Sequence, residues 1–222
     1  KNPQVIFPDA DLEAAVDAAV FGAYFNVGQC CNSGSRIIVH HSIVEEFTAA
    51  VAARAAHVVT GDPLDERTDV GAIVNQQQLE VIDSYVTQGQ QAGATLVTGG
   101  QAREGGQGLF YEPTIFSGVT PDMTIAREEI FGPVLSILAF DTAEEAVALA
   151  NGTEYGLSAG VWSSNIDTAL SVARDLRAGT VWVNRWMDGY PELPFGGYGA
   201  SGIGRELGRQ ALDEFSEIKT IQ

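Results

Sequence analysis

Basic residues are scarce in this sequence. Lys and Arg together number 12 of 222 residues, against 29 Asp and Glu, and the formal net charge is −17. This shortage excludes nucleic acid as a partner, because binding to phosphates needs clustered Lys and Arg. An acidic surface of this kind is instead typical of a soluble protein.

Long apolar runs are lacking as well. No stretch approaches the roughly 20 apolar residues of a membrane-spanning helix, and we therefore expect no membrane partner. The opening residues, KNPQVIFPDADLE, show neither the basic start nor the apolar centre of a signal segment.

Cysteine is limited to one adjacent pair, Cys30 and Cys31. Adjacent cysteines rarely pair with each other, which excludes a disulfide scaffold and favours a cytoplasmic location. The three histidines include the neighbours His40 and His41, and they form neither an HExxH motif nor a metal site with paired CxxC motifs. We therefore expect no metal.

Strand patterns alternate with helix patterns along one sizeable domain. Apolar runs predict strands at 36–40, 133–140, 157–163 and 180–184, with a short strand and turn at 94–100. This order predicts an α/β fold, in which a largely parallel open sheet is covered by helices.

Helix starts are marked by side chains that can cap a helix. Three predicted helices begin at a capping residue and have a predicted end: Asp11 to about 25, Ser42 to about 56, and Asn75 to Gly93. Ser42 forms a capping box with Glu45, and Thr142 forms one with Glu145 at the start of a fourth helix. Two further helices are predicted at 166–177 and in the tail to about 215.

The segment FNVGQCCNSGSR (25–36) places cysteine in a Gly-rich turn between a helix and a strand. Backbone N–H groups in such a turn can stabilise a thiolate or an oxyanion, which favours a nucleophile. The alternative is that two small apolar side chains merely fill the turn, as free cysteines commonly do.

Two further segments contain candidate binding groups. In REEIFGP (127–133), adjacent carboxylates could bind ribose hydroxyls, or could lie in a solvated loop. The glycines of PFGGYGASGIGRELG (194–208) are spaced GxGxxxG and follow no strand directly, which excludes a dinucleotide fingerprint and favours a flexible loop.

Five segments together resemble the aldehyde dehydrogenase family, in this order and at these spacings. They are FNVGQCCNSGSR, REEIFGPV, NGTEYGLSAGVW (151–162), AGTVWVN (178–184) and LPFGGYGASGIGRELG (193–208). The resemblance implies that residues 1–222 form the catalytic domain, and that about 205–222 return to the cofactor and oligomerisation region. It also implies that a Rossmann-type cofactor-binding half precedes Lys1.

The same resemblance implies roles for particular residues. Cys31 matches the nucleophile, which forms a thiohemiacetal and then a thioester with an aldehyde. Glu129 matches the residue that binds the nicotinamide ribose of NAD or NADP, and Phe131 the aromatic beside it. Trp186 and Phe195 match positions of the substrate tunnel.

The resemblance also implies what these residues would need. The general-base glutamate belongs to a Glu-Leu-Gly-Gly-Lys motif that ends at Lys1, so we expect the isolated chain to be inactive. Full-length relatives are expected to be homodimers or homotetramers. Trp186 resembles the betaine-aldehyde and aminoaldehyde branch, where aromatic faces attract a cation, and Glu192 could add a carboxylate. A neutral aldehyde remains the alternative.

Two other functions remain open. A cysteine hydrolase or thioesterase would use His40 or His41 as its base. A non-catalytic oligomerisation fragment would use the C-terminal KTIQ, which resembles the subunit-joining strand of the family.

Overall fold

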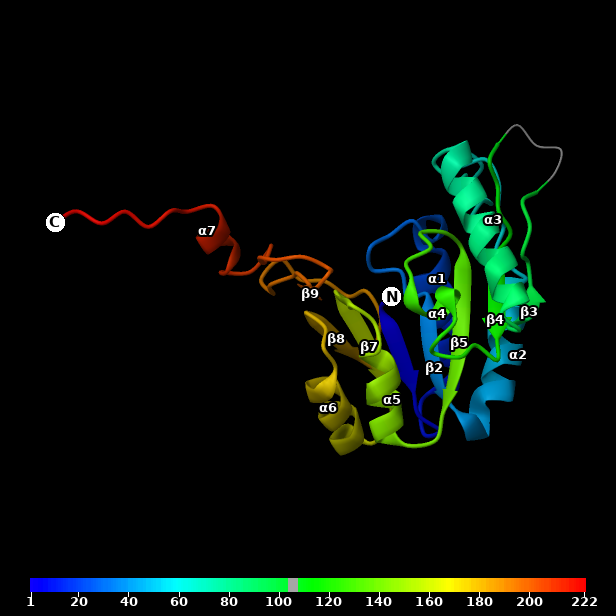
Figure 1. Ribbon diagram of the computed structural model, residues 1–222, viewed down its shortest axis with the longest axis horizontal. Coiled ribbons are helices and arrows are strands. Elements are labelled where there is room, and N and C mark those ends of the chain that lie inside the picture. The colour runs from blue at the N-terminus through cyan, green and yellow to red at the C-terminus, as the bar shows by residue number, and fades with distance from the viewer. Residues whose placement is uncertain (104–107) are drawn as a thin grey trace.

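The computed structural model describes residues 1–103 and 108–222, and its centre is one seven-stranded sheet (Figure 1). The strands are β1 (Pro3–Ile6), β2 (Arg36–His40), β3 (Thr95–Thr98), β4 (Thr114–Ser117), β5 (Val134–Phe140), β7 (Ser158–Trp162) and β8 (Thr180–Val183). Their order is β3-β4-β5-β2-β1-β7-β8, and only the β3–β4 pair is antiparallel. The predicted α/β fold with a largely parallel open sheet is confirmed.

Helices and short helical turns connect these strands. They are α1 (Leu12–Tyr24), η1 (Phe25–Gly28), η2 (His41–Ile43), α2 (Val44–Ala55), α3 (Gln76–Gln91), α4 (Thr124–Arg127), α5 (Ala143–Ala150), α6 (Ile166–Asp175) and α7 (Ala211–Glu214). A separate two-stranded sheet joins β6 (Tyr155–Gly156) to β9 (Tyr198–Gly199). Among the described residues, no helix combines the length and apolar character needed to cross a membrane.

The core forms on both faces of the sheet because side chains alternate along the strands. On β1, Val5 packs with the α5 and α6 side chains, whereas Ile6 packs with the larger cluster that includes α1 and α2. On β2, Ile37 and Ile38 divide in the same way. Burial on both faces explains why these strands are continuous apolar runs.

Most of the predicted helix caps are present. Asp11 accepts the N–H of Ala14 at 3.1 Å, Asn75 caps α3, and Thr142 caps α5. The prediction of a capping box formed by Ser42 and Glu45 is wrong.

A short 3-10 turn, η2, precedes α2, and α2 begins only at Val44, without a side-chain cap. Ser42 hydrogen-bonds back to Nδ1 of His40 instead, through its N–H at 3.3 Å. The Ser42 hydroxyl is therefore engaged locally, 2.8 Å from that same nitrogen.

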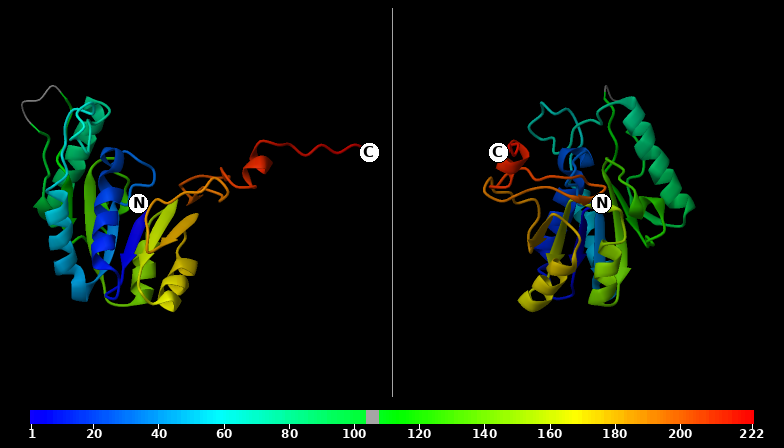
Figure 2. Two further views of the ribbon diagram at one scale, coloured as in Figure 1. Left: turned by 180° about the vertical axis from the view of Figure 1, so that it is seen from behind. Right: turned by 60° about the vertical axis from the view of Figure 1, so that its left-hand side comes forward.

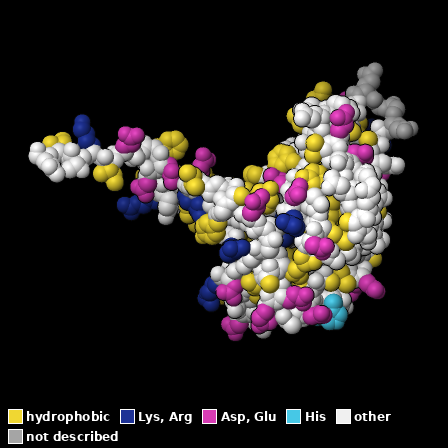
Figure 3. Space-filling model, in the orientation of Figure 1, with side chains coloured by type: hydrophobic (Ala, Val, Ile, Leu, Met, Phe, Trp, Pro, Cys, Tyr) yellow, Lys and Arg dark blue, Asp and Glu magenta, His cyan; other side chains and the backbone are white. Residues whose placement is uncertain are grey.

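The last part of the chain projects away from the sheet, as Figure 1 and the left view of Figure 2 show. The predicted tail helix is only one turn long, at Ala211–Glu214. Phe215, Ile218 and Ile221 are more than four-fifths exposed. In Figure 3, apolar, basic and acidic side chains all lie along this arm, and further acidic side chains gather at the lower border, where the parallel strands end.

Candidate active site

The predicted site segments meet at one edge of the sheet, where the parallel strands begin. Arg36 at the start of β2 is in register with Pro3 of β1 and Ser136 of β5, and Ser158 of β7 is in register with Thr180 of β8. The residues that precede these strands therefore come together. Ligands of open α/β sheets usually bind at the carboxyl ends of the strands, so sequence rules alone would not indicate this edge.

The cysteine loop begins where α1 ends. Asn26 and Val27 have positive φ values of 50° and 56°, and Gly28 follows at 71°, so the chain turns sharply after the helix. A tight turn then brings the Ser33 N–H within 2.9 Å of the Cys30 carbonyl oxygen. Cys31 lies in this turn and is exposed, whereas Cys30 is half-buried.

The surroundings of Cys31 favour the neutral thiol in these 222 residues. Neighbouring atoms displace water from the sulfur and raise its pKa, and the adjacent Cys30 raises it further. The backbone N–H of Asn32 opposes both effects, because it donates to the sulfur. Exposure makes Cys31 accessible, but this chain by itself does not hold it as a thiolate.

A close backbone approach joins the cysteine loop to the segment before β5. A Cβ atom on Gly28 would collide with the carbonyl oxygen of Gly132, so glycine is required there for space as well as for its positive φ. The contact places Glu129 and Phe131, both exposed at the surface, beside the loop. Phe131 itself has a positive φ of 57°.

Glu129 and Phe131 line a small hollow with Cys30 and Lys1. The structure thus brings the predicted ribose-binding residues to the cysteine loop, but Cys30, rather than Cys31, lines the hollow. Lys1 is buried, and burial lowers the pKa of its side chain to about 7, with Arg36 adding to the shift and Glu129 opposing it.

Trp186 lies beneath the cysteine loop and is 7% exposed. Its ring packs against Gly22, Gly34 and Gly160, where added Cβ atoms would lie 2.6 to 3.0 Å from indole atoms. The ring therefore fills the space between α1, the loop and β7. Its expected role as an open wall for a cationic substrate finds no exposed face here, and substrate binding by Trp186 stays a prediction.

Phe195 is half-buried in the segment before β9. Its backbone N–H and carbonyl exchange hydrogen bonds of 2.7 and 2.8 Å with Glu206. This pairing and β9 both lie within the Gly-rich segment, which the sequence predicted to be a flexible loop. Contact of Phe195 with substrate also stays a prediction.

Two features of the site were missed from the sequence. Asn2 connects three segments through its side chain, a role that no local pattern signals. Phe21 and Phe25 are about half exposed, their ring centroids are 5.3 Å apart, and they line a hollow beside α1. Their i, i+4 spacing just before the cysteine turn was an available signal, because such residues share one helix face.

Comparison with known proteins identifies the family of this chain. A family model described as "Aldehyde dehydrogenase family" matches residues 1–221. The chain belongs to the aldehyde dehydrogenase family. An NAD-dependent aldehyde dehydrogenase of Sinorhizobium meliloti, known from a crystal structure, is 55% identical with a TM-score of 0.96, over 98% of this chain and 43% of that one.

Other members of the family are similarly related. An aldehyde dehydrogenase of Davidiella tassiana is 48% identical, and a betaine aldehyde dehydrogenase of Brucella anthropi is 46% identical. Each matches 100% of this chain, which covers 44% and 46% of the two relatives. The chain therefore spans less than half the length of these relatives.

Proposed function

We propose that this chain is the catalytic part of an aldehyde dehydrogenase, an enzyme that oxidises an aldehyde to a carboxylic acid. Its nucleophile is Cys31. One observation carries the proposal: an exposed cysteine lies in a glycine-bounded turn whose backbone touches the segment of Glu129 and Phe131. The sulfur in this turn is accessible from solvent, as attack on a carbonyl carbon requires.

The chemistry of Cys31 would proceed through two covalent states. The thiolate attacks the aldehyde carbon, a C–S bond forms, and the π electrons move to oxygen to give a thiohemiacetal alkoxide. The Cys31 N–H is a candidate donor to that oxygen. When the C–H bond breaks with its electron pair, the C=O bond reforms as a thioester. Water then cleaves the C–S bond, which releases the acid and the thiol.

NAD or NADP would supply the acceptor of that electron pair when bound. Glu129 and Phe131 fit its ribose end, because Glu129 offers an exposed carboxylate to hydroxyl groups and Phe131 an aromatic surface that is 39% exposed. Since the chain spans less than half of its relatives, we infer that these 222 residues alone do not turn over aldehyde. A positioned base contributes about 10²–10⁴-fold, and in the family the glutamate that acts as the base lies four residues before the position of Lys1.

The structure disfavours the alternative of a cysteine hydrolase or thioesterase, because neither histidine proposed as its base lies near Cys31. His40 lies at the far end of β2 from the cysteine loop, about 13 Å along the strand at the usual rise per residue. Its Nδ1 is engaged with Ser42, and the His41 side chain pairs with Asp141. Neither histidine is placed to activate Cys31.

For the substrate, we propose a preference for a cationic aldehyde, with a neutral aldehyde as the alternative. The test compares one of each, of similar length. The relatives include both a betaine aldehyde dehydrogenase and enzymes named only aldehyde dehydrogenase, at nearly equal identity. Glu192 is exposed and could face a cation. A kcat/KM for hexanal equal to or above that for betaine aldehyde would exclude the cationic preference.

We also propose that the projecting arm, with Phe215, Ile218 and Ile221, packs on a second copy of the chain. Three apolar side chains that are more than four-fifths exposed support this. In an enzyme extended to the length of its relatives, removal of residues 205–222 should lower the mass measured by analytical ultracentrifugation from that of a dimer or tetramer to that of a monomer. An unchanged mass would exclude the arm as the joining element.

The catalytic proposal is tested in an enzyme extended to the length of its relatives, called here the extended enzyme. Cys31→Ala should abolish aldehyde oxidation, measured by the absorbance of the reduced nicotinamide, whereas Cys30→Ala should retain most of it. The reverse result would show that Cys30 is the nucleophile.

A further inference from the structure

We propose that Asn2 is a positioning residue, whose side chain holds the cysteine loop in the shape that Cys31 needs for its reaction. The proposal rests on the proposed function, in which Cys31 is the nucleophile. It concerns a buried residue immediately before β1, distant in sequence from the loop that it contacts.

The amide nitrogen of Asn2 donates two hydrogen bonds into the loop. Nδ2 lies 2.6 Å from the carbonyl oxygen of Cys31 and 2.8 Å from that of Ser33. Both protons of the amide are therefore used on the residues that define the turn. Asn2 is 6% exposed, so water has little access to replace it.

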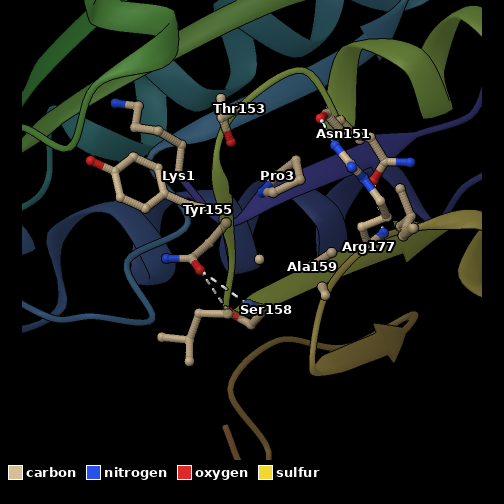
Figure 4. A pocket seen from close by; sticks show the side chains of 14 residues that line it. Lys1, Pro3, Asn151, Thr153, Tyr155, Ser158, Ala159 and Arg177 are labelled. Carbon is tan, nitrogen blue, oxygen red and sulfur yellow. Dashed lines mark hydrogen bonds between the residues drawn. The ribbon is translucent and has the colours of Figure 1, made fainter. Parts of the chain in front are cut away.

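The amide oxygen of Asn2 is held in turn by Ser158, at the start of β7. The Ser158 hydroxyl and N–H lie 2.9 and 3.3 Å from Oδ1 (Figure 4). The same hydroxyl lies 3.3 Å from Oδ1 of Asn32, the residue after the nucleophile. The Asn2 side chain thus connects three segments, the starts of β1 and β7 and the cysteine loop.

Asparagine suits this position for two independent reasons. Its amide provides two donors and an acceptor, whereas aspartate would keep the acceptor and lose both donors. Asn2 also has a φ of 42°, in the left-handed region that asparagine tolerates better than most residues. Few side chains meet both requirements.

The held loop has a chemical consequence at the sulfur. Burial and the neighbouring Cys30 raise the pKa of Cys31, whereas the backbone N–H of Cys31 itself and, to a larger extent, that of Asn32 lower it. The Asn32 N–H is aimed by the turn whose carbonyls Asn2 binds. Release of the turn would remove the donor and leave the effects that favour the neutral thiol.

The test measures alkylation of Cys31 by iodoacetamide as a function of pH, in a Cys30→Ser background of this chain, with the modified residue identified by mass spectrometry. For Asn2→Ala we expect the midpoint to rise by about half a unit to one unit, so that labelling at neutral pH slows about three- to tenfold. Asn2→Asp should raise it further, because it adds a negative charge.

Asn151→Ala is the matched control. Its amide nitrogen donates to the Asp175 carbonyl at 2.8 Å, and its amide oxygen accepts from the Arg177 N–H at 2.7 Å. Neither partner belongs to the cysteine loop. This variant should lose thermal stability and keep the alkylation midpoint. Ser158→Ala retains the Asn2 donors but removes the hydroxyl that holds the amide oxygen of Asn2. It should raise the midpoint above that of Asn151→Ala, which covers the case in which the Asn2 variants fail to fold.

An unchanged or lowered midpoint in folded Asn2→Ala, or an equal shift in Asn151→Ala, would overturn the proposal. In the extended enzyme, Asn2→Ala should lower kcat with little change in KM. Full activity of Cys31→Ala would instead overturn the proposed function, while the alkylation result would still decide whether Asn2 holds the loop.

Discussion

The indole ring of Trp186 lies directly beneath Gly34, three residues after the candidate nucleophile. A Cβ atom on Gly34 would lie 2.9 Å from Cζ2 of the ring. The cysteine loop therefore rests on an aromatic surface that comes from the segment after β8, more than 150 residues later in the chain. Trp182 packs edge-on against the same ring, with centroids 4.9 Å apart.

We expect Trp186→Ala to destabilise the fold by about 3–5 kcal/mol, because it leaves a cavity between α1, β7 and the cysteine loop. Urea denaturation followed by circular dichroism measures this change. Tyr190→Ala, at a residue that is 52% exposed, is the control and should have little effect. A stability change below 1 kcal/mol for Trp186→Ala would show that the ring is not a support.

Gly28→Ala should disrupt the site more than Gly118→Ala. Both glycines have positive φ values, 71° and 62°, but a Cβ on Gly28 collides with the Gly132 carbonyl, whereas Gly118 has nothing within 4 Å. The difference between the two variants isolates the close approach from backbone strain. Thermal unfolding of both chains checks the prediction, and equal losses would contradict it.

Arg36→Ala should destabilise the chain by about 1.5–3 kcal/mol, because buried charge-assisted hydrogen bonds are lost. Its guanidinium donates to the carbonyls of Leu149 and Ala150 at 3.1 and 2.7 Å, at the carboxyl end of α5. Arg67→Ala is the control. Its ion pair with Asp65 lies at the surface, where such pairs contribute little, so this substitution should leave stability almost unchanged. Guanidinium chloride denaturation distinguishes the two.

In this chain, Cys31 should label with a pH midpoint above that of an unperturbed thiol, about 8.5. Burial and Cys30 both raise its pKa, so the reactive thiolate forms only at higher pH. Cys30→Ser removes one of these causes and should lower the midpoint slightly. Rapid labelling at pH 7 in the isolated chain would contradict this expectation.

Local patterns were sufficient for most of the fold. Asp11 and Asn75 cap helices where capping chemistry predicts, and β2 and β5 follow from apolar runs. The strands β1 and β4 were missed, because four residues next to a proline carry too little pattern to separate a strand from a loop. Their burial depends on neighbouring strands. Ser42 shows the opposite case, where a valid local signal lost to a hydrogen bond with His40.

Short-range patterns and motifs were enough to predict the α/β class, the turn that presents Cys31, and the segment of Glu129 and Phe131. The packed fold was needed to show that these segments meet at the amino ends of the strands, that Trp186 is buried beneath the loop, and that Asn2 binds the loop. Strand order and register bring together residues more than 150 positions apart, such as Asn2 and Ser158. Contacts of that range leave no periodicity in the sequence, since they depend on how the whole sheet assembles.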